Sequence, residues 1–404
     1  MVDKKLDILF AVNIPFPEGG ANTRRISNIA REMAKNGHHV TILIPFARKL
    51  QKKKGSLEGV DVEWCLVPRN AEVFKNKMGR IKLYIQIISR VKWLLKLYKK
   101  SMRKEYDWLY LYQPGFDGLM ATTIAVFFNR KIVSEYVDLL SSSGSDGIIW
   151  KFIYRLQLYA DQKVPLKSNL LITISSKLKN VYEKRNPDVP VLIVPTLVDC
   201  KRFGVGDSSY FRKKLDIRAK FIITFAGSFV KTEGLALLIE AFSMLVRNKK
   251  NIFLLIAGGS LVPGADDPLK LISEFDIEND AEFLGFLPEE KVVDLLAASD
   301  VLVMSKLNDP INHAGFGTKL SEYLSAGRPV IASDVGDISR YLVNDRDVIL
   351  VDPGNLDELV IALQRLVNDR KTCRLLGGHA RKAALHKFDV PPHVLNILNS
   401  MSSN

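Results

Sequence analysis

The chain has 404 residues, 47% of them hydrophobic, so it can bury substantial cores, and its length favours two or three domains. The formal net charge is +14, and its distribution along the chain is more informative than its total. Three widely spaced cysteines, without a CxxC pair or a histidine cluster, argue against a disulfide framework or structural zinc and favour a reducing compartment. No run of about 18 apolar residues predicts a transmembrane helix. The first apolar run is broken by Asn13, Pro15 and Pro17, which is untypical of a signal peptide.

Apolar runs alternate with helical patterns in the first half of the chain. A glycine-bearing loop at 17–20 leads from the first buried strand into a helix from about Ala21 to Asn36, and Gly37 ends that helix. Strands separated by helices predict a parallel sheet with right-handed crossovers. The predicted strands are residues 6–12, 40–44, 108–112, 131–136, 170–174 and 191–194.

Residues 75–104 form a strongly basic segment, with eleven Lys or Arg residues and no Asp or Glu. Such an amphipathic helix predicts contact with an anionic membrane surface. Nucleic acid is the rival interpretation of a basic patch, but no nucleic-acid-binding module accompanies this one. The simplest alternative is a solvated helix face packed on its own domain. The apolar residues at roughly helical spacing are Leu83, Ile87, Ile88, Val91, Leu94, Leu95 and Tyr98, with Tyr84 and Trp93 among them.

The second half repeats the alternation of strands and helices. The charged segment 199–219 is the predicted linker, which gives an N-terminal domain at 1–198 and a C-terminal domain at 220–385. The predicted fold class is α/β, with two doubly wound Rossmann-like domains facing a central cleft at their strand C-terminal ends. The elements predicted in this half are strands at 221–226, 252–257, 282–284, 301–304, 330–332 and 348–351 and a helix at 232–245.

Residues 310–337 carry the most informative motif, PINHAGFGTKLSEYLSAGRPVIASDVGD. Gly315 and Gly317 let the backbone approach a ligand closely, and a helix is predicted to begin near Thr318. The exposed N–H groups and positive dipole end of that helix suit a phosphate. Glu322, one turn on, can accept two hydrogen bonds from vicinal hydroxyls such as those of a ribose. A nucleotide diphosphate is therefore the predicted ligand.

This motif resembles the signature of family 4 GT-B glycosyltransferases, in which two glutamates stand eight positions apart. The resemblance implies that Glu322 holds the ribose, whereas the family's first glutamate, which holds the donor sugar, is replaced by Ala314. We expect Asp309, Asn312 or His313 to take over the sugar contact, or the donor to be recognised differently. The resemblance also implies that a C-terminal helix at 386–404 crosses back onto the first domain.

The segment FAGSFVKTEGLALLIEAF resembles the family's G-R-x-x-x-x-K-G phosphate loop. Its arginine position is Ser228 and its lysine position is Glu233, so Lys231 is the cation left in this loop. A departing diphosphate requires positive charge, and we predict Lys231 and Lys319 as the catalytic cations. Helix N-termini, a weakly active chain, or a solvated Lys231 are the alternatives.

Further donor contacts are predicted in both domains. Gly19 and Gly20 before a helix form an anion-cradling loop to which Arg24 and Arg25 add charge, and they resemble the family's N-terminal loop. The backbone at 285–287 resembles the segment that meets the nucleobase. The predicted donor-binding residues are Gly19, Gly20, Gly227, Ser228, Gly285, Phe286, Leu287, Gly315, Phe316, Gly317, Thr318 and Glu322.

Two departures concern the acceptor side and the metal. The family's V-H-D histidine is absent, since this chain has Ser134–Asp138 reading SEYVD; Glu135 or Asp138 contacts the acceptor or is structural. Asp266 and Asp267 lie in a polar loop and are interpreted as solvated rather than as metal ligands, and the resemblance implies no bound metal.

The predicted function is transfer of a sugar from a nucleotide diphosphate sugar to a membrane-associated glycan or lipid-linked acceptor, with retention implied by the resemblance. The predicted location is the cytoplasmic face of the membrane. The alternatives are a catalytically silent GT-B nucleotide-binding subunit and, within enzymes, a sugar-nucleotide epimerase. The silent subunit is suggested by the substitutions at Ala314, Ser228, Glu233 and Val137.

Overall fold

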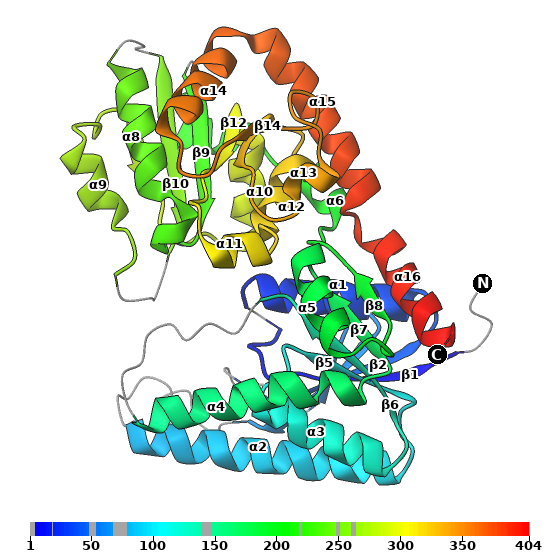
Figure 1. Cartoon of the computed structure of the whole chain (residues 1–404). Coiled ribbons are helices and arrows are strands. Elements are labelled where there is room, and N and C mark those ends of the chain that lie inside the picture. The colour runs from blue at the N-terminus through cyan, green and yellow to red at the C-terminus, as the bar shows by residue number, and fades with distance from the viewer. Residues whose placement is uncertain are drawn as a thin grey trace. The chain divides into compact units, whose positions relative to one another are not determined.

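The computed structural model describes residues 5–17, 19–47, 54–67, 79–138, 148–217, 220–247, 251–259 and 264–403. The chain folds as two compact units: Met1–Pro195 with Val390–Asn404, called unit 1, and Thr196–Asp389, called unit 2. Each unit is built on one mostly parallel sheet that carries helices on both faces (Figure 1). The prediction of two doubly wound α/β domains is confirmed.

Unit 1 has an eight-stranded sheet whose first strand lies in its interior. The strands are β1 (Asp7–Ala11), β2 (His39–Phe46), β3 (Lys54–Leu57), β4 (Val60–Leu66), β5 (Trp108–Tyr112), β6 (Lys131–Tyr136), β7 (Leu170–Thr173) and β8 (Val191–Ile193). Their order is β3-β4-β2-β1-β5-β6-β7-β8, and only β3 runs antiparallel to its neighbour. Because the order reverses between β1 and β5, the carboxyl ends of these two strands mark the crevice where such sheets bind ligands.

The helices of unit 1 form two groups on opposite faces of the sheet. The helices are α1 (Ala21–Lys35), α2 (Gly79–Met102), α3 (Phe116–Phe127), α4 (Ile148–Lys163), α5 (Ser176–Arg185), α16 (Val390–Ser403) and the short η2 (Pro165–Lys167). In Figure 1, α2, α3 and α4 lie together on one face, while α1 and α16 pack against each other on the other. The last helix of the chain therefore belongs to the same unit as the first.

Unit 2 has a six-stranded sheet that is parallel throughout the described residues. Its strands are β9 (Phe221–Gly227), β10 (Ile252–Gly258), β11 (Ala281–Phe283), β12 (Val301–Met304), β13 (Val330–Ser333) and β14 (Ile349–Val351). They follow the order β11-β10-β9-β12-β13-β14, so the ligand crevice of this sheet lies at the carboxyl ends of β9 and β12. The central strands are apolar runs buried on both faces, as parallel strands between helices require.

The helices of unit 2 follow its strands in alternation. They are α6 (Cys200–Phe203), α7 (Ser209–Lys214), η3 (Lys231–Glu233), α8 (Leu235–Val246), α9 (Pro268–Glu274), α10 (Glu289–Ala298), α11 (Pro310–Ala314), α12 (Thr318–Ser325), α13 (Ile338–Tyr341), α14 (Leu356–Asn368) and α15 (Arg370–Lys387). The predicted linker at 199–219 contains α6 and α7.

One hairpin was not predicted. β3 and β4 pair through a two-residue turn, Glu58–Gly59, with φ of 49° and 85°. Positive φ at both turn residues is typical of the tight hairpin turns that match strand twist. The charged, glycine-containing sequence of β3 lacks an apolar alternation, which is why its strand character was missed.

Among the helices of the described residues, none is both long and apolar enough to cross a membrane.

Candidate functional site

Four glycines meet at the carboxyl ends of β9, β10 and β11 in unit 2. The Gly258 N–H donates to the Gly285 carbonyl at 2.9 Å, and the Gly259 N–H donates to the Gly227 carbonyl at 3.3 Å. Gly258 has φ of 132°, and a Cβ on it would lie 1.8 Å from the Gly227 oxygen. Only glycine permits this close approach, so the edge is left without side chains where a ligand would contact backbone.

The loop after β9 is anchored on the end of β12. Gly234 has φ of 74°, and a Cβ there would lie 1.8 Å from the Ser305 carbonyl oxygen. The Ser305 hydroxyl donates to the Gly234 carbonyl at 2.8 Å, and the Leu307 N–H donates to the Thr232 carbonyl at 2.9 Å. Lys231 is exposed in the short η3 turn of this loop. The loop conformation is therefore set by backbone contacts, and Lys231 extends from a fixed turn.

A lysine that was not predicted, Lys306, occupies the centre of this edge. It lies two residues after the end of β12 and is only 8% exposed. Its ammonium lies 2.5 Å from Glu233 Oε1 and donates to Asn312 Oδ1 at 3.0 Å. Glu233 stands where the resembled family has a lysine in its phosphate loop. Its carboxylate is thus paired with a cation that follows another strand, β12. An ammonium has three N–H donors, so these two contacts leave one for a ligand.

The helix α12 begins beside Lys306 and has no side-chain cap at Gly317. A Cβ on Gly317 would lie 2.6 Å from the Met304 sulfur and 3.4 Å from Lys306 Cε, so the helix start is packed closely onto the end of β12. The N–H groups of the first turn, including that of Thr318, are therefore not satisfied by a capping side chain. Tyr323 fixes the helix to β9, since its hydroxyl donates to the Ala226 carbonyl at 2.9 Å and accepts the Ala226 N–H at 2.7 Å.

The predicted ribose ligand and one predicted cation are neighbours on α12. Lys319 Nζ lies 3.0 Å from Glu322 Oε2, one turn along the helix. Glu322 is 7% exposed, so this carboxylate is largely withdrawn from solvent. Lys319 therefore stands between the helix start and the carboxylate, where it can contact a phosphate or hold Glu322 in place.

The glycine loop before α12 contains a short helix, α11, rather than an irregular segment. Asp309 caps it by accepting the Ile311 N–H at 2.8 Å. Asn312 is 7% exposed, and its amide nitrogen donates to the Thr232 and Leu307 carbonyls, each at 2.9 Å. Its carboxamide therefore braces the two loops around Lys306. Both ring nitrogens of His313 are engaged as well, by Asn308 Oδ1 at 2.9 Å and by the Gly336 N–H at 3.4 Å.

Two predicted donor contacts have very different surroundings. The Phe316 side chain is 6% exposed and packs against Tyr341 and Phe388, with ring centroids 5.5 and 5.6 Å away. Its ring therefore belongs to the core of unit 2, and only its backbone remains for a ligand. Phe286, in contrast, is 86% exposed beside Gly285, whose φ is 68°.

In unit 1 the predicted glycine loop leads into α1. A Cβ on Gly19 would lie 2.1 Å from the Thr23 hydroxyl oxygen, while a Cβ on Gly20 would meet nothing within 4 Å. Gly20 is the N-cap of α1, and no side chain caps the helix there. The loop thus has the open helix start that was predicted for anion binding.

Arg25, expected to add charge to that loop, is instead a buried structural residue. Its Nε lies 2.5 Å from Glu135 Oε1, and its terminal nitrogens donate to the Pro195 and Val194 carbonyls at 2.6 and 2.8 Å. Tyr110 donates to Glu135 Oε2 at 2.6 Å. Burial opposes the charge on Arg25, but the Glu135 carboxylate together with the nearby Tyr112 and Tyr110 raises the pKa of Arg25. Both partners are fully engaged, so Glu135 has a structural role rather than an acceptor contact.

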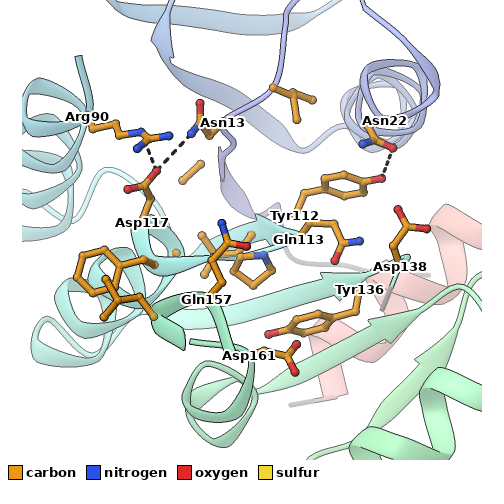
Figure 2. A pocket seen from close by; sticks show the side chains of 18 of the residues that line it. Asn13, Asn22, Arg90, Tyr112, Gln113, Asp117, Tyr136, Asp138, Gln157 and Asp161 are labelled. Atoms are coloured by element: carbon orange, nitrogen blue, oxygen red, sulfur yellow. Dashed lines mark hydrogen bonds and ion pairs between the residues drawn. The ribbon is translucent and has the colours of Figure 1, made fainter. Parts of the chain in front are cut away.

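Unit 1 contains a polar pocket of about 520 Å³ at the carboxyl ends of β1, β5 and β6. Figure 2 shows the polar side chains that line it: Asn13, Asn22, Arg90, Tyr112, Gln113, Asp117, Tyr136, Asp138, Gln157 and Asp161. Asp117 holds Arg90 Nε at 3.1 Å and the Asn13 amide at 3.2 Å. The pocket lies where the strand order of the sheet reverses, and Asp138, one of the two predicted acceptor contacts, is among its lining residues.

Residues 207–383 match the family model described as glycosyl transferases group 1. The matched stretch contains every strand of unit 2 and the glycine edge with Lys306. The second unit is a group 1 glycosyltransferase domain. The group 1 domain thus includes both of the loops that Asn312 braces.

Solved structures share the fold of the whole chain. HepE from Anabaena in complex with UDP has a TM-score of 0.72 at 18% identity, covering 99% of this chain and 100% of that one. Sucrose-phosphate synthase from Thermosynechococcus elongatus has a TM-score of 0.74 at 16% identity, covering 99% of both chains. These neighbours are GT-B glycosyltransferases, and the predicted GT-B fold class is confirmed.

Sequence similarity to curated proteins is more limited. A D-inositol 3-phosphate glycosyltransferase from Gordonia bronchialis is 27% identical over 241 residues, which cover 56% of this chain and 51% of that protein. The chain spans about half the length of the curated relatives it matches.

The group 1 domain brings most of the predicted donor residues to one edge of its sheet. The pairing of Lys306 with Asn312 was not predicted. One signal in the sequence indicated Lys306 itself, because it is a charged residue soon after a buried parallel strand, at the edge where ligands bind. Among the described residues, no group of three or more His, Cys, Asp or Glu side chains is placed to hold a metal ion.

Proposed function

We propose that this chain transfers a sugar from a nucleotide diphosphate sugar to a membrane-associated glycan or lipid-linked acceptor, with retention of anomeric configuration and without a bound metal. The observation that carries the proposal is the glycine edge of the group 1 domain, with Lys306 at its centre and the uncapped start of α12 beside it. The HepE structures with UDP and UDP-glucose support a nucleotide diphosphate sugar as the donor.

The reaction breaks the bond between the anomeric carbon and the diphosphate, so negative charge grows on the departing phosphate. Preorganised N–H groups and cations aimed at that charge are the main catalytic requirement. In this proposal Lys306 is the cation that stabilises this charge, and Glu233 and Asn312 hold it in place. Lys231 lies in the loop after β9, and Lys319 lies in the first turn of α12. The substitution of the loop lysine by Glu233 then relocates the cation rather than removing it.

Glu322→Gln should weaken nucleotide binding about 10- to 150-fold, because one charge-assisted hydrogen bond to a ribose hydroxyl contributes about 1.5–3 kcal/mol. Calorimetric titration with UDP and GDP measures this directly. Glu358→Gln, on α14, is the matched control, since its carboxylate only accepts the Asp352 N–H. A folded Glu322→Gln variant with the parent's affinity would refute the ribose assignment.

Turnover separates the proposal from its alternatives. A panel of UDP- and GDP-sugars is assayed for donor hydrolysis alongside nucleotide affinity. Sugar release supports the transferase, whereas nucleotide binding without turnover of any donor supports the silent GT-B subunit. Conversion of a nucleotide sugar into its epimer supports the epimerase.

The membrane setting of the proposal is supported by α2, which has two apolar faces. Every fourth residue of one face is buried, with Trp93 donating to the Leu43 carbonyl at 3.0 Å and Leu97 fully buried. The opposite face has an exposed apolar stripe, 44–66% accessible, at spacings of three and four residues. This α2 stripe comprises Tyr84, Ile87, Ile88, Val91, Leu95, Tyr98 and Met102.

The cations of α2 divide into two groups. Lys96 and Lys100 lie 2.6 and 3.5 Å from Glu63 of β4, and Arg90 is paired with Asp117, so these charges are neutralised within the unit. Lys92 and Lys99 of α2 are exposed, and so is Lys104, which follows the helix. Among the described side chains, these three are charges that anionic headgroups would meet. Residues 75–78 of the predicted segment and the side chains of residues 79–83 lie outside what the structure describes.

Replacing three lysines by Gln, at Lys92, Lys99 and Lys104, should reduce sedimentation of the protein with phosphatidylglycerol vesicles. The reason is that each lysine near an anionic surface contributes about 1 kcal/mol to binding. Wild-type binding should also fall with added salt, because screening acts within about 8 Å at physiological ionic strength. The matched control replaces Lys213, Lys214 and Lys382, which are exposed in unit 2. Equal binding to neutral and anionic vesicles, or to neither, would contradict the membrane role. RNA capture without vesicle binding would favour the nucleic-acid alternative.

A further inference from the structure

The polar pocket of unit 1 contains a hydroxyl group that the described residues leave without a hydrogen-bond partner. Tyr136 is 2% exposed and lines the pocket, yet its hydroxyl has no hydrogen-bond partner among the described residues. Its ring is fixed by Tyr182, with centroids 4.4 Å apart, and Figure 2 shows it beside Asp161 on the side of the pocket where Gln157 lies. Burying a hydroxyl without a partner destabilises the protein, so a ligand oxygen is the expected partner.

The protonation state of this hydroxyl favours a donor role. Burial, followed by the nearby Asp161 carboxylate, raises the pKa of Tyr136 well above its usual value. The Asp161 carboxylate accepts hydrogen bonds from the Tyr182 hydroxyl at 2.6 Å and from Arg185 at 3.0 Å. Tyr136 therefore remains a neutral O–H that can donate to a ligand at any ordinary pH.

The charges of the lining exclude one class of ligand. The lining has three carboxylates, of which Asp117 is paired with Arg90 and Asp161 with Arg185, and Asp138 is the third. A phosphate in this pocket would meet these carboxylates and no lysine of the lining, while the two guanidinium groups already hold carboxylates. Neutral hydroxyl groups suit the same carboxylates well, because an ionised carboxylate accepts hydrogen bonds without needing a cation.

The remaining groups match the surface of a sugar ring. Gln113 and Gln157 offer carboxamides that both donate and accept, and Ile153 and Leu156 provide apolar wall. We infer that this pocket binds an uncharged polyhydroxylated ring, a pyranose or cyclitol without phosphate, and that the Tyr136 hydroxyl donates to one of its oxygens. As the acceptor subsite of the sugar transfer, this inference rests on the proposed function.

Binding of neutral rings is tested on the full chain without any donor. Methyl glucosides and myo-inositol are compared with glucose 6-phosphate and inositol phosphate by saturation-transfer NMR. We expect the neutral probes to bind and the phosphates to bind at least tenfold more weakly. Phosphates that bind as well as the neutral rings, or neutral rings that do not bind at all, would overturn the inference.

Tyr136→Phe separates a binding hydroxyl from a structural one. The variant should bind neutral rings about three- to tenfold more weakly, the effect of one neutral hydrogen bond. Its thermal midpoint should stay level or rise, because an unsatisfied buried hydroxyl is removed. Tyr106→Phe is the control: Tyr106 bonds Ser101 at 2.5 Å at the opposite end of β5, so this change should lower the midpoint and leave ring binding unchanged.

Unchanged ring affinity in Tyr136→Phe would overturn the assignment of the hydroxyl. UDP affinity is measured on the same samples. If ring binding fails while UDP binds and donors turn over, the pocket assignment is wrong but the transferase proposal stands. If ring binding holds while no donor turns over, the pocket assignment stands and its role as an acceptor subsite is wrong.

Discussion

Lys306→Met should lower turnover of the donor about 100- to 1,000-fold, the effect of removing one group that stabilises charge in a transition state. The side chain of methionine has similar length, so the close packing of Lys306 Cε beneath Gly317 is kept while the charge is lost. The effect should fall more on kcat than on KM, because the charge on the phosphate grows as the bond breaks. Steady-state assays with the active donor measure both parameters.

Two comparisons identify which cation acts. Lys231→Met and Lys319→Met test the cations first predicted from the sequence, and each should reduce turnover less than Lys306→Met does. Glu233→Gln keeps an acceptor for Lys306 but removes the carboxylate, so it should change turnover far less than loss of Lys306 itself. A Lys306→Met enzyme with the parent's kcat, beside a Lys231 or Lys319 variant that has lost it, would return the role to the predicted lysines.

Arg25→Met should destabilise unit 1 by about 3–5 kcal/mol, because it leaves the fully buried Glu135 carboxylate without its cation. That loss is a large share of the 5–15 kcal/mol that typically separates folded from unfolded domains. It also releases the Val194 and Pro195 carbonyls, which Arg25 ties to α1. Urea denaturation followed by circular dichroism gives the free energy of unfolding.

The double variant Arg25→Met with Glu135→Gln distinguishes an unpaired charge from lost packing. The carboxamide introduced at position 135 is neutral and can still accept a hydrogen bond from Tyr110, so most of the stability should return. If the double variant is as unstable as Arg25→Met alone, the lost contacts to the two carbonyls, rather than the buried charge, determine the stability of this network.

The strands, and the loop and helix of residues 310–337, could be predicted because their signals are local. Buried parallel strands are short apolar runs, and the motif around Gly315 and Gly317 combines backbone freedom, a helix start and Glu322 within a few residues. Each of these features follows from residues adjacent in the sequence. Their positions in the structure then follow from the rule that parallel strands end at one edge.

The pairs that organise the site are distant in sequence, and no local pattern indicates them. Glu233 and Lys306 are 73 residues apart, and Arg25 and Glu135 are 110 apart. From the sequence, Arg25 beside a glycine loop indicated an anion ligand, and Glu233 indicated the loss of a positive charge from the phosphate loop. Both interpretations changed once the partner was known, because burial forces a charged side chain to find its counter-ion inside the protein.

The division of the chain has a consequence for how the molecule is made. Unit 1 consists of the first 195 residues and the last stretch from Val390, and Val394, Ile397 and Met401 of α16 are buried in it. A ribosome therefore releases the N-terminal part of this unit long before the segment that completes its hydrophobic surface, and the whole of unit 2 emerges in between. During that interval the surface of α1 that later packs on α16 is uncovered, and apolar surface exposed during synthesis is prone to aggregation.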